Sequence, residues 1–286
     1  MPDPLLKILE DSLAWQRDIW NRISWRYLQE IDPKFQPVTD EVIRRARLKA
    51  GEEVLDLGCG TGATTLPAAR AVLPGGQVTA IDISAQMLLI TRMRLGAFGN
   101  VSFEVGRAAG IPLENGSQDV VLSSLVLMFT ITKKGAAREI ARVLRPGGRL
   151  VASVWDVPER CDIVHFQKTI GKFAPDPPAR GVGPASMADP EPFLAELRSY
   201  GVEASYESRT MEWSHASFED AWETFANVTA ARMSPEQIAQ AKAQVLKDMW
   251  GGKDGPRVFR NSVHYIVGRK SGRRPPRGAP RTARRK

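Results

Sequence analysis

The chain has few cysteines and no long apolar run. Its 286 residues include two cysteines, Cys59 and Cys161. Two thiols in so long a chain predict neither a disulfide framework nor a metal site, and they favour a cytoplasmic location. No apolar run approaches the length of a membrane span, and residues 1–4 lack the charged and apolar segments of a signal peptide. With 43% hydrophobic residues, the chain can bury a full core.

Acidic residues are absent from the C-terminal end. Residues 269–286 hold nine Lys or Arg and no acid, so residues 1–268 keep 31 of the 40 basic residues against 32 acidic ones. The body is therefore nearly neutral, and the pI of about 9.7 comes from the tail. Four Pro or Gly within residues 275–280 predict that the tail is disordered. Such a tail can bind nucleic acid or anionic lipid weakly, although a solubilising extension without a fixed partner is the simpler interpretation.

One glycine-rich stretch organises the chain. Residues 53–62 read Glu-Val-Leu-Asp-Leu-Gly-Cys-Gly-Thr-Gly, an apolar run that predicts a buried strand and then breaks at Gly58, Gly60 and Gly62. A helix is predicted over residues 61–72. Strand, glycine turn and helix start form a nucleotide-binding loop, because glycines let the backbone approach a ligand and the helix start offers unpaired N–H groups.

Asp56 separates two cofactor classes that could use such a loop. Gly58, Gly60 and Ala63 satisfy the G-x-G-x-x-A fingerprint of dinucleotide binding. A dinucleotide, however, places an anionic pyrophosphate on the loop, and a carboxylate just before the first glycine would repel it. S-adenosylmethionine carries an ammonium and a sulfonium, which a carboxylate attracts. Asp56 therefore favours S-adenosylmethionine as the cofactor.

A second anchor follows about 20 residues beyond the glycines. Residues 77–81 predict a second buried strand that ends at Asp82, whose carboxylate can accept hydrogen bonds from both ribose hydroxyls. Ile83 is placed to lie against the adenine face, with Met87 nearby on a helix that Ser84 caps. The alternative interpretation of Asp82 is a helix-capping acid without a ligand.

Three motifs together resemble those of one enzyme family. Residues 54–62, residues 81–88, and Leu-Arg-Pro-Gly-Gly-Arg at 144–149 are similar to motifs of the seven-strand, or class I, S-adenosylmethionine-dependent methyltransferases. Within them the chain looks most like the branch of ubiquinone/menaquinone-biosynthesis methyltransferases. The resemblance is specific over residues 20–155 and looser up to residue 268. It implies an α/β fold: a doubly wound, Rossmann-like sheet of seven strands with the last antiparallel, an N-terminal helical lid and a small helical cap inserted late in the chain.

The resemblance includes the N-terminal segment. Residues 20–27, Trp-Asn-Arg-Ile-Ser-Trp-Arg-Tyr, are similar to the family's opening F-D-x-V-A-x-x-Y, in a segment that folds over cofactor and substrate as part of a lid. Trp20 and Tyr27 are therefore candidate ligand contacts. Asn21 and Leu28 depart from the two aspartates usual there. The alternative is a helix docked on the core without touching a ligand.

The chain also departs from the family after its third predicted strand. Gly106-Arg107-Ala108 stands where the family has G-D-A, whose aspartate accepts from the adenine amino group. Arg107 has donors only and cannot take that role. Either backbone groups around Arg107 and Ala108 hold the adenine, or the donor site is weakened.

Further candidates follow the fourth and fifth predicted strands. Because ligands bind at the carboxyl ends of parallel strands, Ser123 and Ser124 are expected beside the methionine half of the donor. Met128 falls where many relatives carry histidine. Trp155, at the tip of the fifth strand, is expected either to wall the methyl-transfer site or to close the core.

The remaining pattern predicts alternating helices and strands. Further helices are expected at residues 5–30, 39–48, 84–95, 133–144, 189–201, 218–228 and 235–249, and further strands at 101–105, 119–124, 149–155, 202–211 and 261–268. Residues 156–189, interrupted by Pro and Gly, are expected to be irregular. The chain is thus divided into an N-terminal helical lid (1–50), a cofactor-binding core (51–156), a lid, cap and substrate region (157–250), a final strand (251–270) and a disordered basic tail (271–286).

Methyl transfer makes few demands on side chains. It is an in-line displacement to which positioning can contribute about 7–11 kcal/mol. A base is needed only where the acceptor loses a proton. Among the three histidines, His165 is the candidate base, with a surface or packing role as the alternative, and His264 is expected to be structural because it alternates with apolar residues.

We therefore expect an S-adenosylmethionine-dependent methyltransferase acting on a small, apolar, aromatic or quinone-like acceptor. One alternative is a nucleic-acid or protein methyltransferase recruited by the basic tail. Against it, the chain has no Asn/Asp-Pro-Pro-Tyr tetrapeptide and no recognisable RNA-binding domain. The other alternative is a protein that binds S-adenosylmethionine without turnover, which Arg107 and Met128 leave open.

Overall fold

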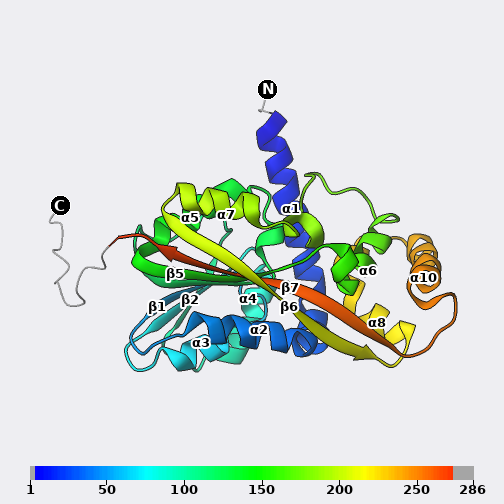
Figure 1. The fold of residues 1–286 in the computed structure, drawn as a ribbon, viewed down its shortest axis with the longest axis horizontal. Coiled ribbons are helices and arrows are strands. Elements are labelled where there is room, and N and C mark those ends of the chain that lie inside the picture. The colour runs from blue at the N-terminus through cyan, green and yellow to red at the C-terminus, as the bar shows by residue number, and fades with distance from the viewer. Residues whose placement is uncertain (1–3, 273–286) are drawn as a thin grey trace.

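The computed structural model describes residues 4–272 as one seven-stranded sheet with helices on both faces (Figure 1). The strands are β1 (Glu53–Leu57), β2 (Gln77–Asp82), β3 (Val101–Val105), β4 (Gln118–Ser124), β5 (Leu144–Trp155), β6 (Val202–His215) and β7 (Arg257–Lys270). Their order is β3-β2-β1-β4-β5-β7-β6. β7 runs antiparallel to both of its neighbours, and the other pairs are parallel. The expected α/β fold with an antiparallel last strand is confirmed.

The helices cover both faces of this sheet. They are α1 (Pro4–Arg26), α2 (Asp32–Ala46), α3 (Thr65–Ala71), α4 (Ala85–Leu95), α5 (Lys133–Val143), α6 (Asp162–Gly171), α7 (Glu191–Ser199), α8 (Phe218–Phe225), α9 (Asn227–Ala230) and α10 (Pro235–Trp250). Figure 1 shows α5 and α7 on one face and α2 and α3 on the other. None of the helices within residues 4–272 has the length and apolar character needed to cross a membrane.

The central strands are buried on both faces. The last four residues of β1 and the first six of β4 are buried. Strands covered on both sides read as continuous apolar runs, which is why the sequence pattern located them. Because parallel strands share one direction, their carboxyl ends meet at the same edge of the sheet. The functional candidates are gathered at that edge.

Two helices begin at other residues than expected. α2 begins at Asp32 rather than residue 39, because Pro33 occupies its first turn, where no N–H is required, and the π-helix η1 (Tyr27–Ile31) leads directly into it. α3 begins at Thr65 rather than residue 61, because Gly62 has a φ of +89°, which an α-helix does not allow.

One helix was missed. Residues 162–171, expected to be irregular, form α6. Prolines at 158 and 175 bracket a proline-free stretch in which Ile163, Phe166 and Ile170 are buried at helical spacing. The prolines therefore mark the limits of an ordered element, and the prediction of a continuous irregular segment is wrong.

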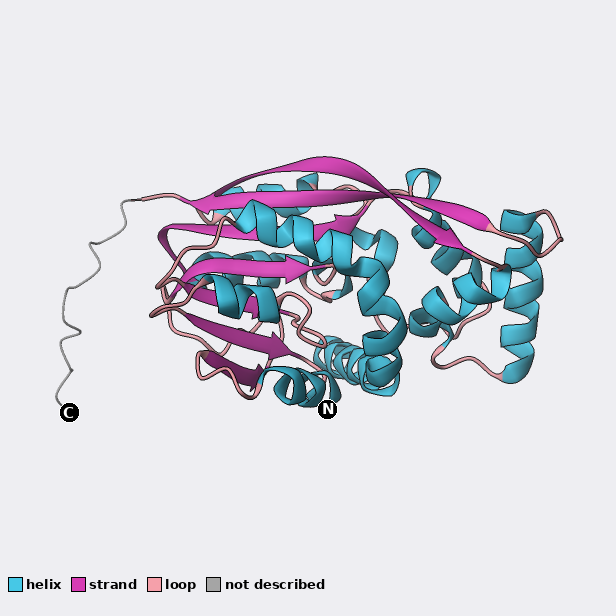
Figure 2. Ribbon diagram, turned by 90° about the horizontal axis from the view of Figure 1, so that it is seen from below, coloured by secondary structure: helices cyan, strands magenta, loops and turns pink. Residues whose placement is uncertain are grey.

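The last two strands extend beyond the rest of the sheet. β6 and β7 pair from Val202↔Lys270 to His215↔Arg257 and carry α8, α9 and α10 between them, as expected from the sequence (Figure 1). Figure 2 shows these helices gathered beside one end of the sheet. α6 packs against α9 and α10, so this helical region also includes a segment that precedes β6.

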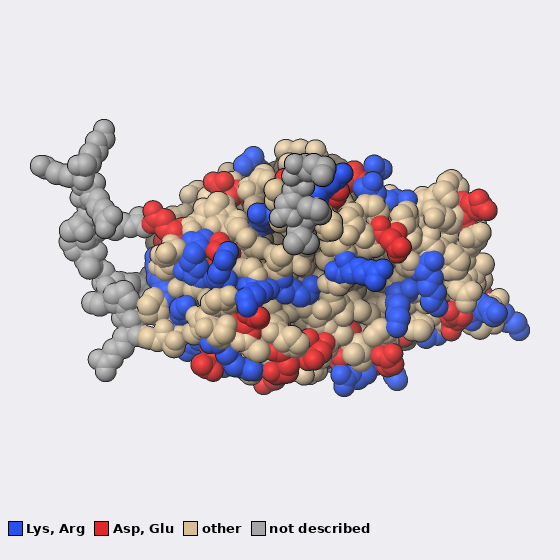
Figure 3. All heavy atoms as spheres, turned by 90° about the horizontal axis from the view of Figure 1, so that it is seen from above, with Lys and Arg blue, Asp and Glu red and all other residues tan. Residues whose placement is uncertain are grey.

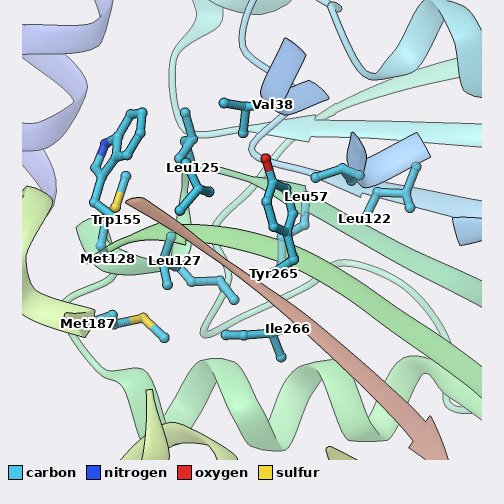
Figure 4. Packing of buried hydrophobic residues seen from close by; sticks show 14 of the residues in the cluster. Val38, Leu57, Leu122, Leu125, Leu127, Met128, Trp155, Met187, Tyr265 and Ile266 are labelled. Carbon is cyan, nitrogen blue, oxygen red and sulfur yellow. The ribbon is translucent and has the colours of Figure 1, made fainter. Parts of the chain in front are cut away.

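One apolar core joins the sheet to the helical region. Trp155 at the end of β5 lies beside Leu125 and Met128, which follow β4 (Figure 4). Phe166 of α6 and Phe259 of β7 are fully buried in the same core. The core therefore reaches the carboxyl ends of the strands, where the cavities lie.

The C-terminal basic residues divide into two groups. Arg269 and Lys270 belong to β7, where Arg269 Nη1 donates to Gly147 O at 3.1 Å and Lys270 Nζ donates to Tyr200 O at 2.9 Å. Residues 273–286, for which disorder is predicted, lie outside the described residues.

Candidate functional site

Backbone hydrogen bonds attach the glycine loop to the end of β2. Gly58 N and Cys59 N both donate to Ile81 O, at 2.7 and 3.0 Å. Gly58 has a φ of +75°, and a Cβ atom there would lie 2.4 Å from Val126 Cγ1. At Gly60, with a φ of +55°, a Cβ would meet nothing within 4 Å. The loop is closed against the protein at Gly58 and has open space above Gly60.

A cavity lies above this loop, at the carboxyl ends of the strands. The predicted residues that line it are Trp20, Tyr27, Gly58, Cys59, Gly60, Asp82, Ile83, Met87, Gly106, Arg107, Ala108 and Ser124. They come from α1, η1, the glycine loop, α4 and the ends of β2, β3 and β4. The tertiary structure therefore brings most of the predicted cofactor residues to one place.

Backbone N–H groups hold the Asp82 carboxylate on the surface of this cavity. Its Oδ2 accepts from Gly60 N at 2.9 Å, and its Oδ1 accepts from Ser84 N at 2.8 Å. Burial raises the pKa of Asp82 to about 6, and hydrogen bonds from backbone N–H groups oppose that shift. Each carboxylate oxygen retains a lone pair for a further hydrogen bond. Asp82 can therefore accept from hydroxyl groups of a ligand.

Asp56 does not line the cavity. The residue is 1% exposed, and its Oδ2 accepts from Thr65 Oγ1 at 2.6 Å. Burial raises the pKa of Asp56 to about 7. The carboxylate thus ties the end of β1 to the first residue of α3. The structure corrects the expected contact of Asp56 with a ligand, because the strand turns this side chain toward α3.

Two other predicted contacts also lie away from the cavity. A Cβ at Gly62 would lie 2.8 Å from Leu95 Cδ1, so this glycine allows α4 to pack against the loop. Ser123 Oγ donates to Leu57 O at 3.1 Å in the interior of the sheet. Ser124 lines the cavity instead, since successive residues of a strand face opposite sides.

A second cavity adjoins the first and is largely aromatic. The predicted residues Met128 and Trp155 line it, and five residues line both cavities: Trp20, Tyr27, Phe35, Leu125 and Phe129. The ring of Phe35 lies 5.3 Å from that of Trp155 and 5.7 Å from that of Phe225. Trp155 therefore walls a cavity as well as closing the core.

Gln167 is the one amide side chain that lines this second cavity within residues 4–272. Its Nε2 donates to Phe225 O, and its Oε1 accepts from Thr229 Oγ1. Both polar ends of the amide are thus engaged by the protein. The second cavity consequently presents mainly apolar surface to a bound molecule.

His165 lies on the far side of α6 from this cavity. Ile163 and Gln167, four positions apart, line the cavity, whereas His165 lies midway between them and faces the opposite side of the helix. In the described part of the chain no histidine lines either cavity. His264 Nε2 lies 3.2 Å from Asp156 Oδ1, in a buried pair between β7 and the end of β5. The structure does not place His165 as a base.

Arg107 is exposed where it lines the first cavity. No carboxylate within residues 4–272 pairs with its guanidinium, so the side chain is free to point to solvent. Gly106 and Ala108 line the cavity beside it. Adenine binding by the backbone of this segment stays a prediction.

Several cavity residues carried no recognisable motif. Asp32 and Phe35 come from α2, whose start the sequence pattern misplaced. Leu125 has a φ of +58°, rare for a residue other than glycine, and its N–H donates to both O and Oγ of Ser153 at 3.0 Å. Leu125 directly follows a predicted strand, which could have placed it at the sheet edge, but only the fold shows its backbone conformation.

The core of the chain has a recognisable sequence family. Residues 55–152 match the family described as "Methyltransferase domain". Over this stretch the chain is similar to that family. The matched segment runs from β1 into β5 and includes the glycine loop, Asp82 and Ser124. S-adenosylmethionine, the cofactor expected from the sequence, is the methyl donor of the class I methyltransferases.

Two curated relatives match about half of the chain. A demethylmenaquinone methyltransferase of Tropheryma whipplei (strain Twist) is 38% identical over 149 residues, covering 50% of this chain and 60% of the relative. A ubiquinone/menaquinone biosynthesis C-methyltransferase of Hahella chejuensis is 34% identical over 151 residues, covering 52% of this chain and 58% of the relative. The chain thus spans less than two thirds of the length of these relatives.

A solved structure shares the fold over most of the chain. The YcgJ protein of Bacillus subtilis superposes with a TM-score of 0.61 at 19% identity, covering 82% of this chain and 99% of the other. The shared fold therefore covers more of the chain than the sequence matches do.

Proposed function

We propose that the protein transfers the methyl group of S-adenosylmethionine to a small apolar acceptor, aromatic or quinone-like, that lies in the second cavity. The observation that carries this proposal is the shared wall of the two cavities. Five residues, Trp20, Tyr27, Phe35, Leu125 and Phe129, line both the space above the glycine loop and the aromatic space beside it. The curated relatives named for quinone biosynthesis support the same class of acceptor.

The first cavity fits the donor by its chemistry. Open space above Gly60 leaves room for a ligand close to the backbone. Asp82 would hold the ribose hydroxyls, with Ile83 against the adenine. When bound, S-adenosylmethionine supplies an electrophilic methyl group on a positively charged sulfur.

The second cavity fits an acceptor that is flat and apolar. Along its wall, the ring of Phe35 lies 5.3 Å from that of Trp155 and 5.7 Å from that of Phe225. Apolar surface removed from water contributes about 25 cal/mol per Å² to binding. A charged acceptor would lose its hydration there without a partner, since both ends of Gln167 are engaged.

Positioning supplies the catalysis that these residues can offer. Tyr27 lies where the two cavities meet, and burial, followed by the carboxylates of Asp32 and Asp82, raises the pKa of its hydroxyl far above the usual value. Its hydroxyl therefore stays protonated and is able to donate a hydrogen bond. Holding donor and acceptor in line can contribute about 7–11 kcal/mol without a base.

The proposal is tested with S-adenosylmethionine labelled in its methyl group. The full chain is incubated separately with hydroxylated quinones and phenols, small charged amines, a peptide mixture and RNA, and transfer of the label is measured by mass spectrometry. Label is expected in the apolar aromatic class alone. Label in RNA or peptide would favour the alternative of a macromolecular substrate. Tight donor binding with no label in any class would favour a protein that binds the donor without turnover.

The macromolecular alternative depends on the basic tail. Most of that tail lies outside the described residues. On the face of the body shown in Figure 3, acidic side chains lie among the basic ones, whereas a nucleic-acid surface is dominated by one sign of charge. A small acceptor is therefore better supported by the described residues. The predicted cytoplasmic location stays a prediction.

A further inference from the structure

Two carboxylates line the first cavity within residues 4–272, and only one of them was expected. Asp82 holds Gly60 N on one side of the glycine loop. Asp32, from the first turn of α2, lies against the next residue of the loop, Thr61, whose Oγ1 donates to Asp32 Oδ2. The loop is therefore flanked by one carboxylate on each side.

Asp32 is held in place by a second partner. Arg94 Nη1 donates to Thr61 O at 2.6 Å and lies 3.3 Å from Asp32 Oδ2. The Asp32 side chain is 12% exposed, and its other oxygen, Oδ1, takes no hydrogen bond from residues 4–272. One oxygen thus anchors the carboxylate to the loop, and the other is left for a ligand in the cavity.

A π-helix directly before Asp32 positions this residue beside the glycine loop. The π-helix Tyr27–Ile31 joins α1 to α2 without a break, and the cap N–H of Asp32 donates to Tyr27 O across it. π-Turns of this kind are frequent at functional sites because the extra residue re-aims the side chains that follow. Burial raises the pKa of Asp32, while Thr61 and Arg94 oppose the shift.

We infer that Asp32 binds the ammonium group of the amino-acid half of S-adenosylmethionine. This inference rests on the proposed function. An ammonium group taken out of water needs a carboxylate partner. Asp56, which the sequence favoured for that role, is turned into the interior toward Thr65. Asp82 lies with Ile83 at the end of β2, the side expected for ribose and adenine. Asp32 is the carboxylate that remains for the opposite end of the ligand.

The test compares three ligands that differ in charge. Of the positive charges, S-adenosylmethionine carries the ammonium and the sulfonium, S-adenosylhomocysteine carries only the ammonium, and 5′-methylthioadenosine carries neither. The first two ligands also share the amino-acid carboxylate, which 5′-methylthioadenosine lacks. Their affinities for the wild-type protein and for Asp32→Asn are measured by calorimetry. Asp32→Asn should weaken the first two ligands by roughly tenfold to a hundredfold and change the third by less than about twofold.

Two further variants control for structural effects. Asp40→Asn removes an exposed carboxylate from the same helix, where it accepts from Gln36 Nε2, and should leave all three affinities unchanged. Thr61→Val removes the anchoring hydroxyl but keeps the Asp32 charge. If Asp32 acts only by holding the loop, Thr61→Val will reproduce the pattern of Asp32→Asn, and the inference is overturned.

Other outcomes separate this inference from the proposed function. Equal weakening of all three ligands, or weakening of S-adenosylmethionine alone, would show that Asp32 does not recognise the ammonium. Absence of S-adenosylmethionine binding to the wild-type protein would instead defeat the proposed function. Retained binding of 5′-methylthioadenosine to Asp32→Asn shows that the variant is folded.

Discussion

The two cavities are built in different ways. The floor of the first consists of short stretches at the ends of successive strands, such as Gly58–Gly60, Asp82–Ile83 and Gly106–Ala108, and α1, η1 and α2 add further lining residues. The second is formed by single residues from distant elements, among them Trp20, Phe35, Trp155, Ile163 and Phe225. Because strand ends converge in any parallel sheet, the first kind of site can be read from local motifs. The second kind depends on how helices pack over the sheet.

The two cavities also differ in chemistry. The first cavity, the proposed donor cavity, contains two carboxylates: Asp82 accepts from backbone N–H groups, and Asp32 accepts from a hydroxyl. The second cavity, the proposed acceptor cavity, is surrounded by aromatic rings that contact one another. Phe35 contacts Trp155, Trp213 and Phe225. Substitutions in the two cavities should therefore have separable effects. Those in the first cavity should change donor affinity, and those in the second should change acceptor recognition.

The largest expected effect concerns Asp56, which lies behind the donor cavity. In the folded protein the pKa of Asp56 is about 7, against an ordinary value of 3.8, so the wild type loses stability as pH rises between these values. Asp56→Asn is free of this loss. The difference in free energy of unfolding between variant and wild type should grow by up to about 4 kcal/mol from pH 4 to pH 7.

Urea unfolding at a series of pH values measures this difference, with the exposed Asp40→Asn as a control that should follow the wild type. Donor affinity of Asp56→Asn should stay near the wild-type value, because the residue does not line the cavity. A large loss of donor affinity would return Asp56 to the binding site and weaken the distinction between residues that line the cavity and residues that support it.

The next effect concerns Asp82, which lines the donor cavity. Asp82→Ala should weaken S-adenosylhomocysteine binding by about 2–3 kcal/mol, because two ribose hydroxyls lose a charged acceptor. NAD should show no binding to the wild type. Asp82→Asn, which retains an acceptor oxygen, separates loss of charge from disturbance of Gly60 and Ser84. Tight NAD binding without any response to the methyl donor would overturn the donor assignment.

Arg107 tests the adenine side of the donor cavity. Arg107→Asp introduces an acceptor for the adenine amino group and should tighten donor binding by about 1.5–3 kcal/mol, whereas Arg107→Ala should change it little. The structure offers Arg107 no carboxylate partner within residues 4–272. If both variants weaken binding or turnover, the aspartate more strongly, Arg107 has a positive role in the site.

Trp155 tests the acceptor cavity. Trp155→Phe keeps an aromatic ring but reduces the aromatic surface beside Phe35. The acceptor KM should therefore rise by a factor that corresponds to about 1 kcal/mol. Donor affinity should stay within about twofold, since Trp155 lines the second cavity and not the first. Equal changes in donor and acceptor parameters would show that the two cavities act as one site.

The smallest effect is expected at the tail. Removal of residues 273–286 should leave the free energy of unfolding and the turnover of a small acceptor unchanged, because the segment has almost no apolar side chain to dock with. The truncation keeps Ser271, whose N–H and Oγ donate to Gly201 O. Loss of activity, together with salt-sensitive RNA binding by the full chain, would favour the macromolecular substrate.

The structure confirms the sequence-based predictions where residues interact with near neighbours. The strand before Gly58, the capping of α4 by Ser84 and the strand that ends at Asp82 were all predicted correctly. These features depend on apolar runs buried on both faces and on glycine or hydroxyl chemistry within a few residues. The residues that decide such features are neighbours in the chain, so the sequence alone is sufficient to predict them.

The direction in which a side chain points was harder to predict. Asp56 and Ser123 were assigned to the correct strand ends, yet Asp56 faces Thr65 and Ser123 faces Leu57 O. His165 was assigned to a loop and lies on the side of α6 that faces away from the second cavity. A one-residue difference moves a side chain to the other face of a strand, and a two-residue difference nearly does so on a helix.

By itself, the sequence determined the sheet and the glycine loop, because each depends on residues close together in the chain. The choice of a methyl donor over a dinucleotide depended on the direction of the Asp56 side chain, which the structure turns away from the cavity. Only the tertiary structure decided which carboxylates reach the donor cavity and which rings surround the acceptor. Asp32 and Phe35 reach the cavities through the π-helix Tyr27–Ile31 and the packing of α2 on β4 and β5. Contacts of this kind join residues more than a hundred positions apart, as Phe35 and Trp155 do, so no local pattern records them.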